Sequence, residues 1–133
     1  MQSAILSAPS KAILWTGRIL SILAVLFMLF DGISHILKPA PVVQAFAQLG
    51  FPLGLAVCLG VIQLICIILY IIPSTAVLGA VLLTGYLGGA VAIHMRVGNP
   101  AFECIFPIII GIIFWAGLLL RDPALRTVFP VKS

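Results

Sequence analysis

Three ionisable side chains near the end of the first apolar stretch have the spacing of one helical stripe. Asp31, His35 and Lys38 follow one another at i, i+4 and i+7, and an α-helix places such positions on one face. A carboxylate, an imidazole and an ammonium on one face can exchange protons with a ligand or bind its polar head group. The spacing therefore predicts an acid–base or binding site at this end of the helix.

A second set of ionisable side chains surrounds the loop between the third and fourth apolar stretches. His94 and Arg96 end the third stretch, and Glu103 lies in the first turn of the fourth, where a helix N-terminus favours an anion. In an up-and-down bundle, this loop and the end of the first helix lie at the same level. The two sets are therefore expected to form one polar pocket.

Gln63 and Tyr86 fall in the middle of the second and third stretches and are expected to form the floor of this pocket. The predicted site has Asp31 and His94 as a catalytic acid–base pair, and His35, Lys38, Gln63, Tyr86, Arg96 and Glu103 as pocket-lining or ligand-binding residues. A purely structural interpretation stays open for each of them. Asp31 can be neutralised by Lys38, His35 or Arg96, and Gln63 can join two helices through a hydrogen bond.

The cysteines give no sign of a metal or redox site. Cys58, Cys66 and Cys104 form no C-x-x-C pair, so neither a redox motif nor a four-ligand zinc site is predicted. The sequence also has no motif for haem, flavin or nucleotide, and the cofactor is unknown, although either histidine leaves haem ligation open. A disulfide between Cys58 and Cys104 stays open too, because both are expected near the same end of the bundle.

The composition is that of a membrane protein. Of the 133 residues, 63% are hydrophobic and 8% are charged, and the mean hydropathy is +1.34. Soluble domains average about 45–50% apolar and about 25% charged residues, and a chain this short could not bury so much apolar surface in its own core. The net charge of +4 comes from cations scattered singly near the ends of apolar stretches, which argues against a nucleic-acid site.

The chain is predicted to be a single domain, 1–133, with spans at roughly residues 12–37, 52–72, 75–97 and 100–120. Gly98 is expected to follow the third helix, and Ser74 and Asn99 are expected as N-caps. Residues 42–49 have the pattern of a short amphipathic helix that ends at Gly50. The predicted fold is an all-α membrane protein, a four-transmembrane-helix bundle with a short interfacial amphipathic helix between spans 1 and 2.

The distribution of cations predicts the orientation of the bundle. Four spans put both termini on one side, and that side carries Lys11, Arg18, Arg121, Arg126 and Lys132. The other side carries Lys38 and Arg96. By the positive-inside rule, both termini are expected in the cytoplasm, and the pocket in the outer half of the cell inner (plasma) membrane.

Three segments resemble the DoxX-like family: residues 30–39 (FDGISHILKP), residues 48–52 (QLGFP) and residues 88–100 (GGAVAIHMRVGNP). The resemblance extends over nearly the whole chain. It implies a small four-helix membrane protein, mostly of bacteria, related to the DoxX and DoxD group. Some members of that group are subunits of quinone-linked sulfur oxidation systems, or partners of redox and detoxifying enzymes. The family often has Lys where His35 stands and Glu where Gln63 stands, so this chain departs from the pattern at both positions.

Three hypotheses about function follow. The first is an accessory subunit of a redox system that binds a lipophilic small molecule or quinone within the bilayer. The second is a stand-alone membrane enzyme, an isomerase or hydrolase, in which Asp31 and His94 perform acid–base chemistry on a lipophilic substrate. The third is a structural protein that forms a homo-oligomer through the small-residue face of Gly85 and Gly89.

Overall fold

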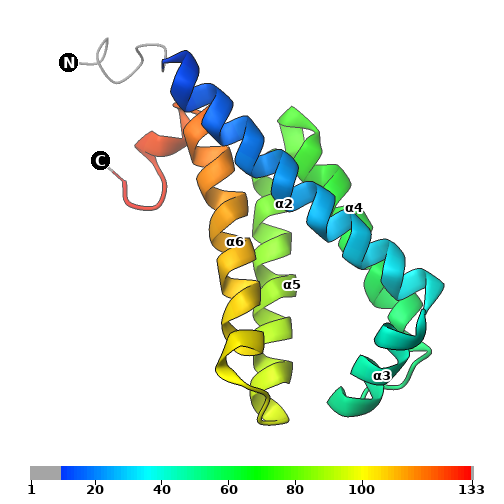
Figure 1. Cartoon of the computed structure of the whole chain (residues 1–133). Coiled ribbons are helices and arrows are strands. Elements are labelled where there is room, and N and C mark those ends of the chain that lie inside the picture. The colour runs from blue at the N-terminus through cyan, green and yellow to red at the C-terminus, as the bar shows by residue number, and fades with distance from the viewer. Residues whose placement is uncertain (1–9, 133) are drawn as a thin grey trace.

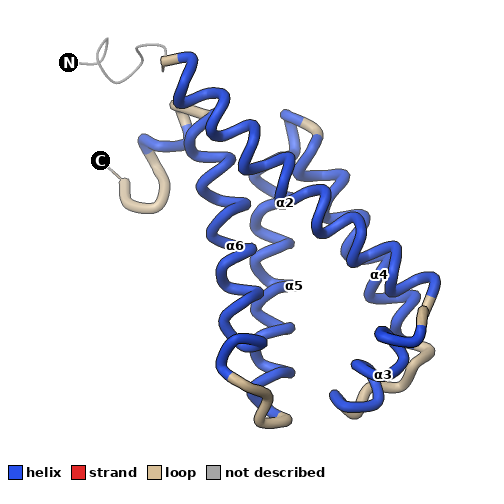
Figure 2. The backbone as a smooth tube through the Cα atoms, in the orientation of Figure 1, coloured by secondary structure: helices blue, strands red, loops and turns tan. Residues whose placement is uncertain are grey.

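The computed structural model describes residues 10–132, and this part of the chain is helical apart from short turns and the loop near its end (Figures 1 and 2). The long helices are α2 (Lys11–Leu37), α4 (Leu55–Ile71), α5 (Ala76–Arg96) and α6 (Ala101–Arg121). A shorter helix, α3 (Ala40–Leu49), follows α2, and the 3-10 helices η1 (Pro73–Thr75) and η2 (Leu125–Thr127) follow α4 and α6. The prediction of an all-α fold is confirmed.

The four long helices pack in a ring. Helix α2 contacts α4 and α6, and α5 contacts the same two helices. In Figure 1, α2 and α4 run together and lean away from α5 and α6 toward the lower end of the molecule, where α3 lies. The ring therefore consists of two arms, α2–α4 and α5–α6, which diverge toward α3.

The outer surface of the bundle is apolar. Large aliphatic and aromatic side chains of all four long helices are exposed, among them Leu23, Phe30, Ile65, Val81 and Ile112. Three segments, namely α2, η1 together with α5, and α6, are long and apolar enough to cross a membrane, whereas the apolar helix α4 has 17 residues. Soluble monomers rarely expose such extensive apolar surface, so these helices belong in lipid and the chain is a multi-pass membrane protein.

Several helix ends follow the local chemistry of the sequence. The side chain of Ser10 accepts a hydrogen bond from the backbone N–H of Ile13 (3.3 Å) and caps the start of α2. Gly50 ends α3 with a φ of 73°, and Gly98 follows the end of α5 with a φ of 72°. Both predicted glycine terminations are therefore confirmed, at positions where the left-handed conformation favours glycine.

Two predicted N-caps are wrong. Ser74 lies inside η1, and α5 begins after Thr75, whose hydroxyl donates to the carbonyl oxygen of Leu69 (2.7 Å). Pro100 rather than Asn99 occupies the N-cap position of α6, which leaves the Asn99 amide available to another side chain. In addition, α4 begins at Leu55 rather than near residue 52, because residues 53–54 form a turn that the N–H of Leu55 closes by donating to the carbonyl oxygen of Pro52 (3.0 Å).

Glycines allow the closest approaches between helices. A methyl group on Gly17 would lie 2.8 Å from the carbonyl oxygen of Gly117, so α2 and α6 touch through their backbones at this point. Further along α2, a methyl group on Gly60 of α4 would lie 2.7 Å from the carbonyl oxygen of Gly32. Such small-residue contacts increase the van der Waals packing that holds helices together in lipid.

Gly85 and Gly89 do not form a contact of this kind. A methyl group on either would meet nothing within 4 Å, so no helix of the described chain approaches this face of α5. Both glycines line a cavity instead. Association of two copies through this face stays a prediction.

The apolar core is built from all four long helices. It includes Met28, Ile67, Leu83 and Phe114, one from each helix. Tyr70 is 1% exposed, and its hydroxyl donates to the carbonyl oxygen of Phe114 (2.7 Å) and lies 3.0 Å from Oγ of Ser21. A hydroxyl buried in the core of a membrane protein needs such partners, and these hydrogen bonds join α4 to α6 and α2.

The glycine contact between α2 and α6 gives a first prediction. We expect Gly17→Ala to lower the free energy of unfolding by about 1–3 kcal/mol, because the added methyl group meets backbone atoms that cannot turn aside. Gly88→Ala adds the same methyl group where nothing lies within 4 Å, and should leave stability unchanged or slightly raised. Unfolding in SDS from bicelles, followed by circular dichroism, measures both. Equal losses would contradict the backbone contact.

Candidate functional site

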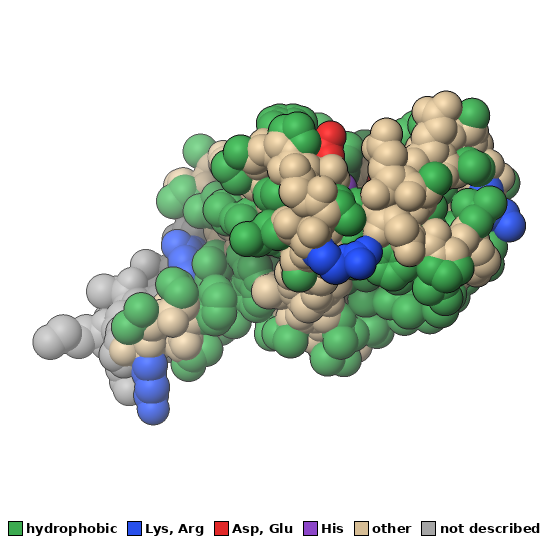
Figure 3. Space-filling view, turned by 90° about the horizontal axis from the view of Figure 1, so that it is seen from below, with side chains coloured by type: hydrophobic (Ala, Val, Ile, Leu, Met, Phe, Trp, Pro, Cys, Tyr) green, Lys and Arg blue, Asp and Glu red, His purple; other side chains and the backbone are tan. Residues whose placement is uncertain are grey.

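A cavity of about 550 Å³ lies between the two arms where they diverge. Helix α3 forms one wall through Pro41, Val42, Ala45, Phe46 and Leu49. Most of the lining is apolar, and its ionisable side chains are Asp31, His35, Tyr86 and His94. Seen from below in Figure 3, the molecule is hollowed between its two halves, with an acidic side chain at the edge and a histidine inside. The expected polar pocket is thus a mainly apolar cavity with a few polar groups.

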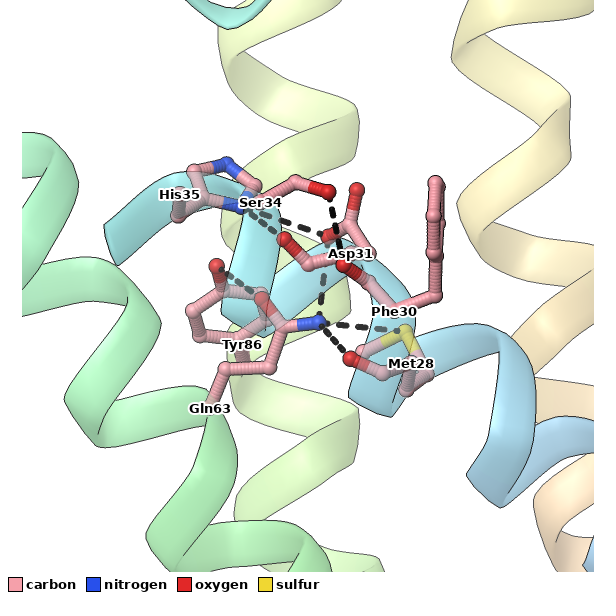
Figure 4. Close-up of polar contacts among 7 residues, drawn as sticks. All are labelled: Met28, Phe30, Asp31, Ser34, His35, Gln63 and Tyr86. Atoms are coloured by element: carbon pink, nitrogen blue, oxygen red, sulfur yellow. Dashed lines mark hydrogen bonds and ion pairs between the residues drawn. The ribbon is translucent and has the colours of Figure 1, made fainter. Parts of the chain in front are cut away.

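Gln63 supports these polar groups from behind. Its side chain is buried at 0% exposure, and its Nε2 donates to Oδ2 of Asp31 (3.0 Å) and to the carbonyl oxygen of Met28 (2.9 Å). Its Oε1 accepts a hydrogen bond from the hydroxyl of Tyr86 (2.8 Å). Figure 4 shows the amide in the middle of this network. The Gln63 side chain of α4 therefore joins α2 to α5, and both of its amide protons are donated in hydrogen bonds.

Asp31 is fixed through only one of its two carboxylate oxygens. Oδ2 accepts from Gln63 and lies 3.6 Å from Nδ1 of His35. The side chain is 42% exposed and lines the cavity, and Oδ1 has no hydrogen-bond partner within residues 10–132. Asp31 is therefore positioned by the protein and still has an acceptor to offer a ligand.

The ring of His35 is held in one orientation and one tautomer. Its Nδ1 lies 2.7 Å from the backbone carbonyl oxygen of Asp31, which can only accept, so Nδ1 carries the proton. In the neutral ring, Nε2 is then an acceptor. Two neighbours fix the ring: Gly60 lets α4 come close to the His35 Cβ, and Phe46 of α3 packs edge-on at a centroid distance of 5.6 Å.

His94 has the opposite tautomer. Its Nδ1 accepts a hydrogen bond from Nδ2 of Asn99 (2.7 Å), so the neutral ring carries its proton on Nε2. Oε2 of Glu103 lies 3.7 Å from the same Nδ1, and the Glu103 side chain is 48% exposed. The two histidines that line the cavity therefore offer it one acceptor and one donor.

Four predicted site residues lie outside the cavity lining: Gln63, which supports it from behind, and Lys38, Arg96 and Glu103. Lys38 follows α2 in the left-handed conformation (φ 54°), so the stripe predicted on this helix stops at His35. Nη2 of Arg96 donates to the carbonyl oxygen of Leu49 (2.6 Å) and thereby ties the end of α5 to the end of α3. A cation is favourable at a helix C-terminus, which explains this placement. Asp31 is paired with Gln63 and His35, not with Lys38 or Arg96.

Other residues of the site had no predicted role in it. Asn99 orients His94, and Phe46 packs on His35. The absence of side chains at Gly85 and Gly89 leaves room for the cavity between the arms. The amphipathic pattern of residues 42–49 was the available signal for Phe46, since it marks an apolar face that has to cover something.

The described side chains of the site can form hydrogen bonds with a ligand and exchange protons with it. Within residues 10–132, no three or more His, Cys, Asp or Glu side chains are grouped in a way that could hold a metal ion. The cysteines are free thiols, with Cys58 exposed, Cys66 buried in the core and Cys104 partly buried. The disulfide between Cys58 and Cys104 that the sequence left open is thus not formed here.

Comparison with protein families identifies the DoxX-like family. Its model matches residues 19–117, about three-quarters of the chain, and this stretch contains every residue that lines the cavity. No curated protein and no solved structure matches the chain.

A double-mutant cycle tests the network around Gln63. We expect Gln63→Leu to lower the free energy of unfolding by about 1–3 kcal/mol, because it leaves buried partners unpaired. Tyr86→Phe should cost less, and the coupling between the two should be about 0.6 kcal/mol and at most about 1.7, the range found for hydrogen bonds between membrane helices. Crossing Gln63→Leu with Tyr70→Phe is the control, because Tyr70 bonds to Phe114 and Ser21 instead. Equal coupling in both cycles would contradict the network.

Proposed function

The chain belongs to the DoxX-like family, and from this premise we propose that it is a membrane-embedded subunit that binds a lipophilic small molecule of the quinone class. The observation that carries the proposal is the cavity of about 550 Å³, with apolar walls and a few fixed polar side chains. Small-molecule sites typically have about 300–1,000 Å³, a mainly apolar lining and a few well-placed polar groups.

The polar groups reach the cavity from both arms, which suits a ligand with polar atoms at opposite edges. Asp31 and His35 face the cavity from α2, and His94 faces it from α5 in the other arm. A quinone ring has this form, because its two oxygen atoms lie across the ring from each other. Its long apolar tail would suit the remaining lining, where aromatic and aliphatic side chains such as Phe27, Leu59 and Ile110 lie.

An accessory role in a redox system is the form of this proposal that the site supports best. The described side chains can bind the ring and exchange protons with its oxygen atoms. A partner protein would exchange electrons with the bound ring, as in the quinone-linked systems that the family resemblance implies. This role differs from that of a stand-alone enzyme, in which Asp31 and His94 would act directly on a substrate.

Filling the cavity tests the binding site. We expect Gly89→Leu to weaken binding of a short-chain decyl benzoquinone at least about tenfold, since its side chain would occupy the cavity while its Cβ meets nothing within 4 Å. Gly88→Leu, on the adjacent residue outside the lining, makes the same substitution in equally open space and should bind like the parent. Equilibrium dialysis with protein in nanodiscs measures both. Equal affinity for the two variants would refute this site.

We further propose that all four long helices cross the cell inner membrane, with both termini in the cytoplasm. The 17 residues of α4 extend over about 26 Å, slightly less than the hydrocarbon core of about 30 Å. A helix at this lower limit can still span, because the bilayer thins locally around it. The excess of cations at the end with the termini favours the cytoplasm for that side.

Single cysteines placed at the two ends test this orientation. In a variant without the three native cysteines, Gly54→Cys should react with a membrane-impermeant maleimide in intact spheroplasts, because residue 54 lies in an exposed turn at the outer end. Ser74→Cys, in the turn at the opposite end of α4, should react only after the membrane is opened. The reverse pattern would invert the orientation. Reaction of both from outside would exclude a spanning α4.

A further inference from the structure

We propose that the cavity binds the reduced, hydroquinone form of a quinone-type ligand in preference to the oxidised form. This inference rests on the proposed function and adds the chemical state of the ligand. It follows from the hydrogen-bonding character of the four polar side chains that line the cavity. Three of them offer acceptors, and one offers a donor.

Asp31 supplies the strongest acceptor. Its Oδ2 is occupied by the amide of Gln63, while Oδ1 has no partner in residues 10–132. A carboxylate accepts hydrogen bonds and donates none, and a charged acceptor binds a hydroxyl more strongly than a neutral one does. A hydroxyl of the ligand would therefore be bound here, whereas a carbonyl oxygen would meet a second acceptor.

His35 offers a second acceptor for a reason fixed by its own helix. Its only proton in the neutral state is on Nδ1, where the carbonyl oxygen of Asp31 accepts it at 2.7 Å. Nε2 is left with a lone pair. Because the backbone of α2 imposes this tautomer, the ring cannot switch to donate from Nε2 without losing that hydrogen bond.

Tyr86 and His94 complete the set. The hydroxyl proton of Tyr86 is given to Oε1 of Gln63 (2.8 Å), so its oxygen can only accept from a ligand. His94 keeps a proton on Nε2, because its Nδ1 accepts from Asn99 (2.7 Å). The single donor of the set therefore comes from α5, on the other side of the cavity from Asp31 and His35.

Quinone and hydroquinone differ in their hydrogen-bond donors, and this is the property that the four polar side chains recognise. The oxidised ring has two carbonyl oxygens and no donor, so only one of them could be satisfied, by His94. The hydroquinone has two hydroxyls: one can donate to Asp31 or His35 of α2, and the other can accept from His94 and donate to the hydroxyl oxygen of Tyr86, both of α5. A polar group buried without a partner opposes binding strongly, so the mismatch disfavours the oxidised form.

Preferential binding of the reduced form has a thermodynamic consequence. A site that binds hydroquinone more tightly than quinone raises the midpoint potential of the bound couple. For a two-electron couple, a tenfold ratio of dissociation constants corresponds to about 30 mV. The bound ligand would thus be held in its reduced state more firmly than the ligand free in the bilayer.

Binding of three matched probes tests the inference. A decyl benzoquinone, its hydroquinone and the dimethyl ether of that hydroquinone are titrated anaerobically into protein in nanodiscs at about pH 8, where a free imidazole is neutral. We expect the hydroquinone to bind at least about tenfold more tightly than the quinone, and the dimethyl ether to bind no more tightly than the quinone. If the quinone binds as tightly as the hydroquinone or more so, the inference fails while the proposed function stands. If no probe binds, both fail.

Asp31→Asn provides the matched variant. Asparagine keeps the shape of the side chain and introduces a donor, so the preference should fall at least about tenfold while affinity for the quinone is kept or raised. A misfolded variant would lose affinity for both forms, so the two measurements distinguish misfolding from a specific loss of the preference for hydroquinone. Asp122→Asn makes the same change at the other end of the bundle, where Oδ1 caps the N–H of Leu125, and should keep the parent preference. An unchanged preference in Asp31→Asn would overturn the inference.

Discussion

The structure depends on one constraint, that a polar group inside a bilayer has to find its partners within the protein. Gln63 meets it completely: one amide proton goes to Asp31, the other to the backbone of Met28, and its oxygen accepts from Tyr86. Because these partners lie on α2 and α5, a single side chain of α4 fixes the relative heights of three helices. The same bonds leave Asp31 with one oxygen for a ligand and Tyr86 with no proton for it. Structural stability and ligand recognition are thus set by the same amide.

The cavity follows from where α2 makes its two closest contacts. Near its start, α2 touches α6 at Gly17 and Gly117, and fifteen residues later it touches α4 at Gly32 and Gly60. Fifteen residues extend over roughly 22 Å, so the helix has to cross from one neighbour to the other within the membrane. It remains in contact with α6 as far as Phe27, whose ring lies edge-on to Phe106 at 5.3 Å. Beyond that point the arms separate, and the space between them is covered by α3.

The helices could be predicted from the sequence, because the length of an apolar stretch and the glycine and proline residues near its ends determine locally where a helix lies. Four of the eight predicted site residues, Asp31, His35, Tyr86 and His94, line one cavity, and their role in binding a ligand stays a prediction. Which atoms they present could not be predicted, since this depends on partners distant in sequence, such as Gln63 for Asp31. Gly85 and Gly89 show a second limit. Small residues permit close helix packing and also permit empty space, and only the positions of the other helices decide between the two.

The helix α3 explains why the hydrogen-bonding character of so few atoms can matter. It covers the diverging end of the arms, with Phe46 buried beneath it and Arg96 of α5 bonded to its last carbonyl oxygen. Helix α3 supplies an apolar wall of the cavity and is tied to the other arm by this hydrogen bond, while the Asp31 side chain stays 42% exposed. In water, a mismatched donor or acceptor is easily compensated, whereas it is not once a bound ligand has displaced water from between apolar walls. The apolar lining therefore favours a lipophilic ligand, and it also strengthens the discrimination between the protonated and unprotonated oxygen atoms of that ligand.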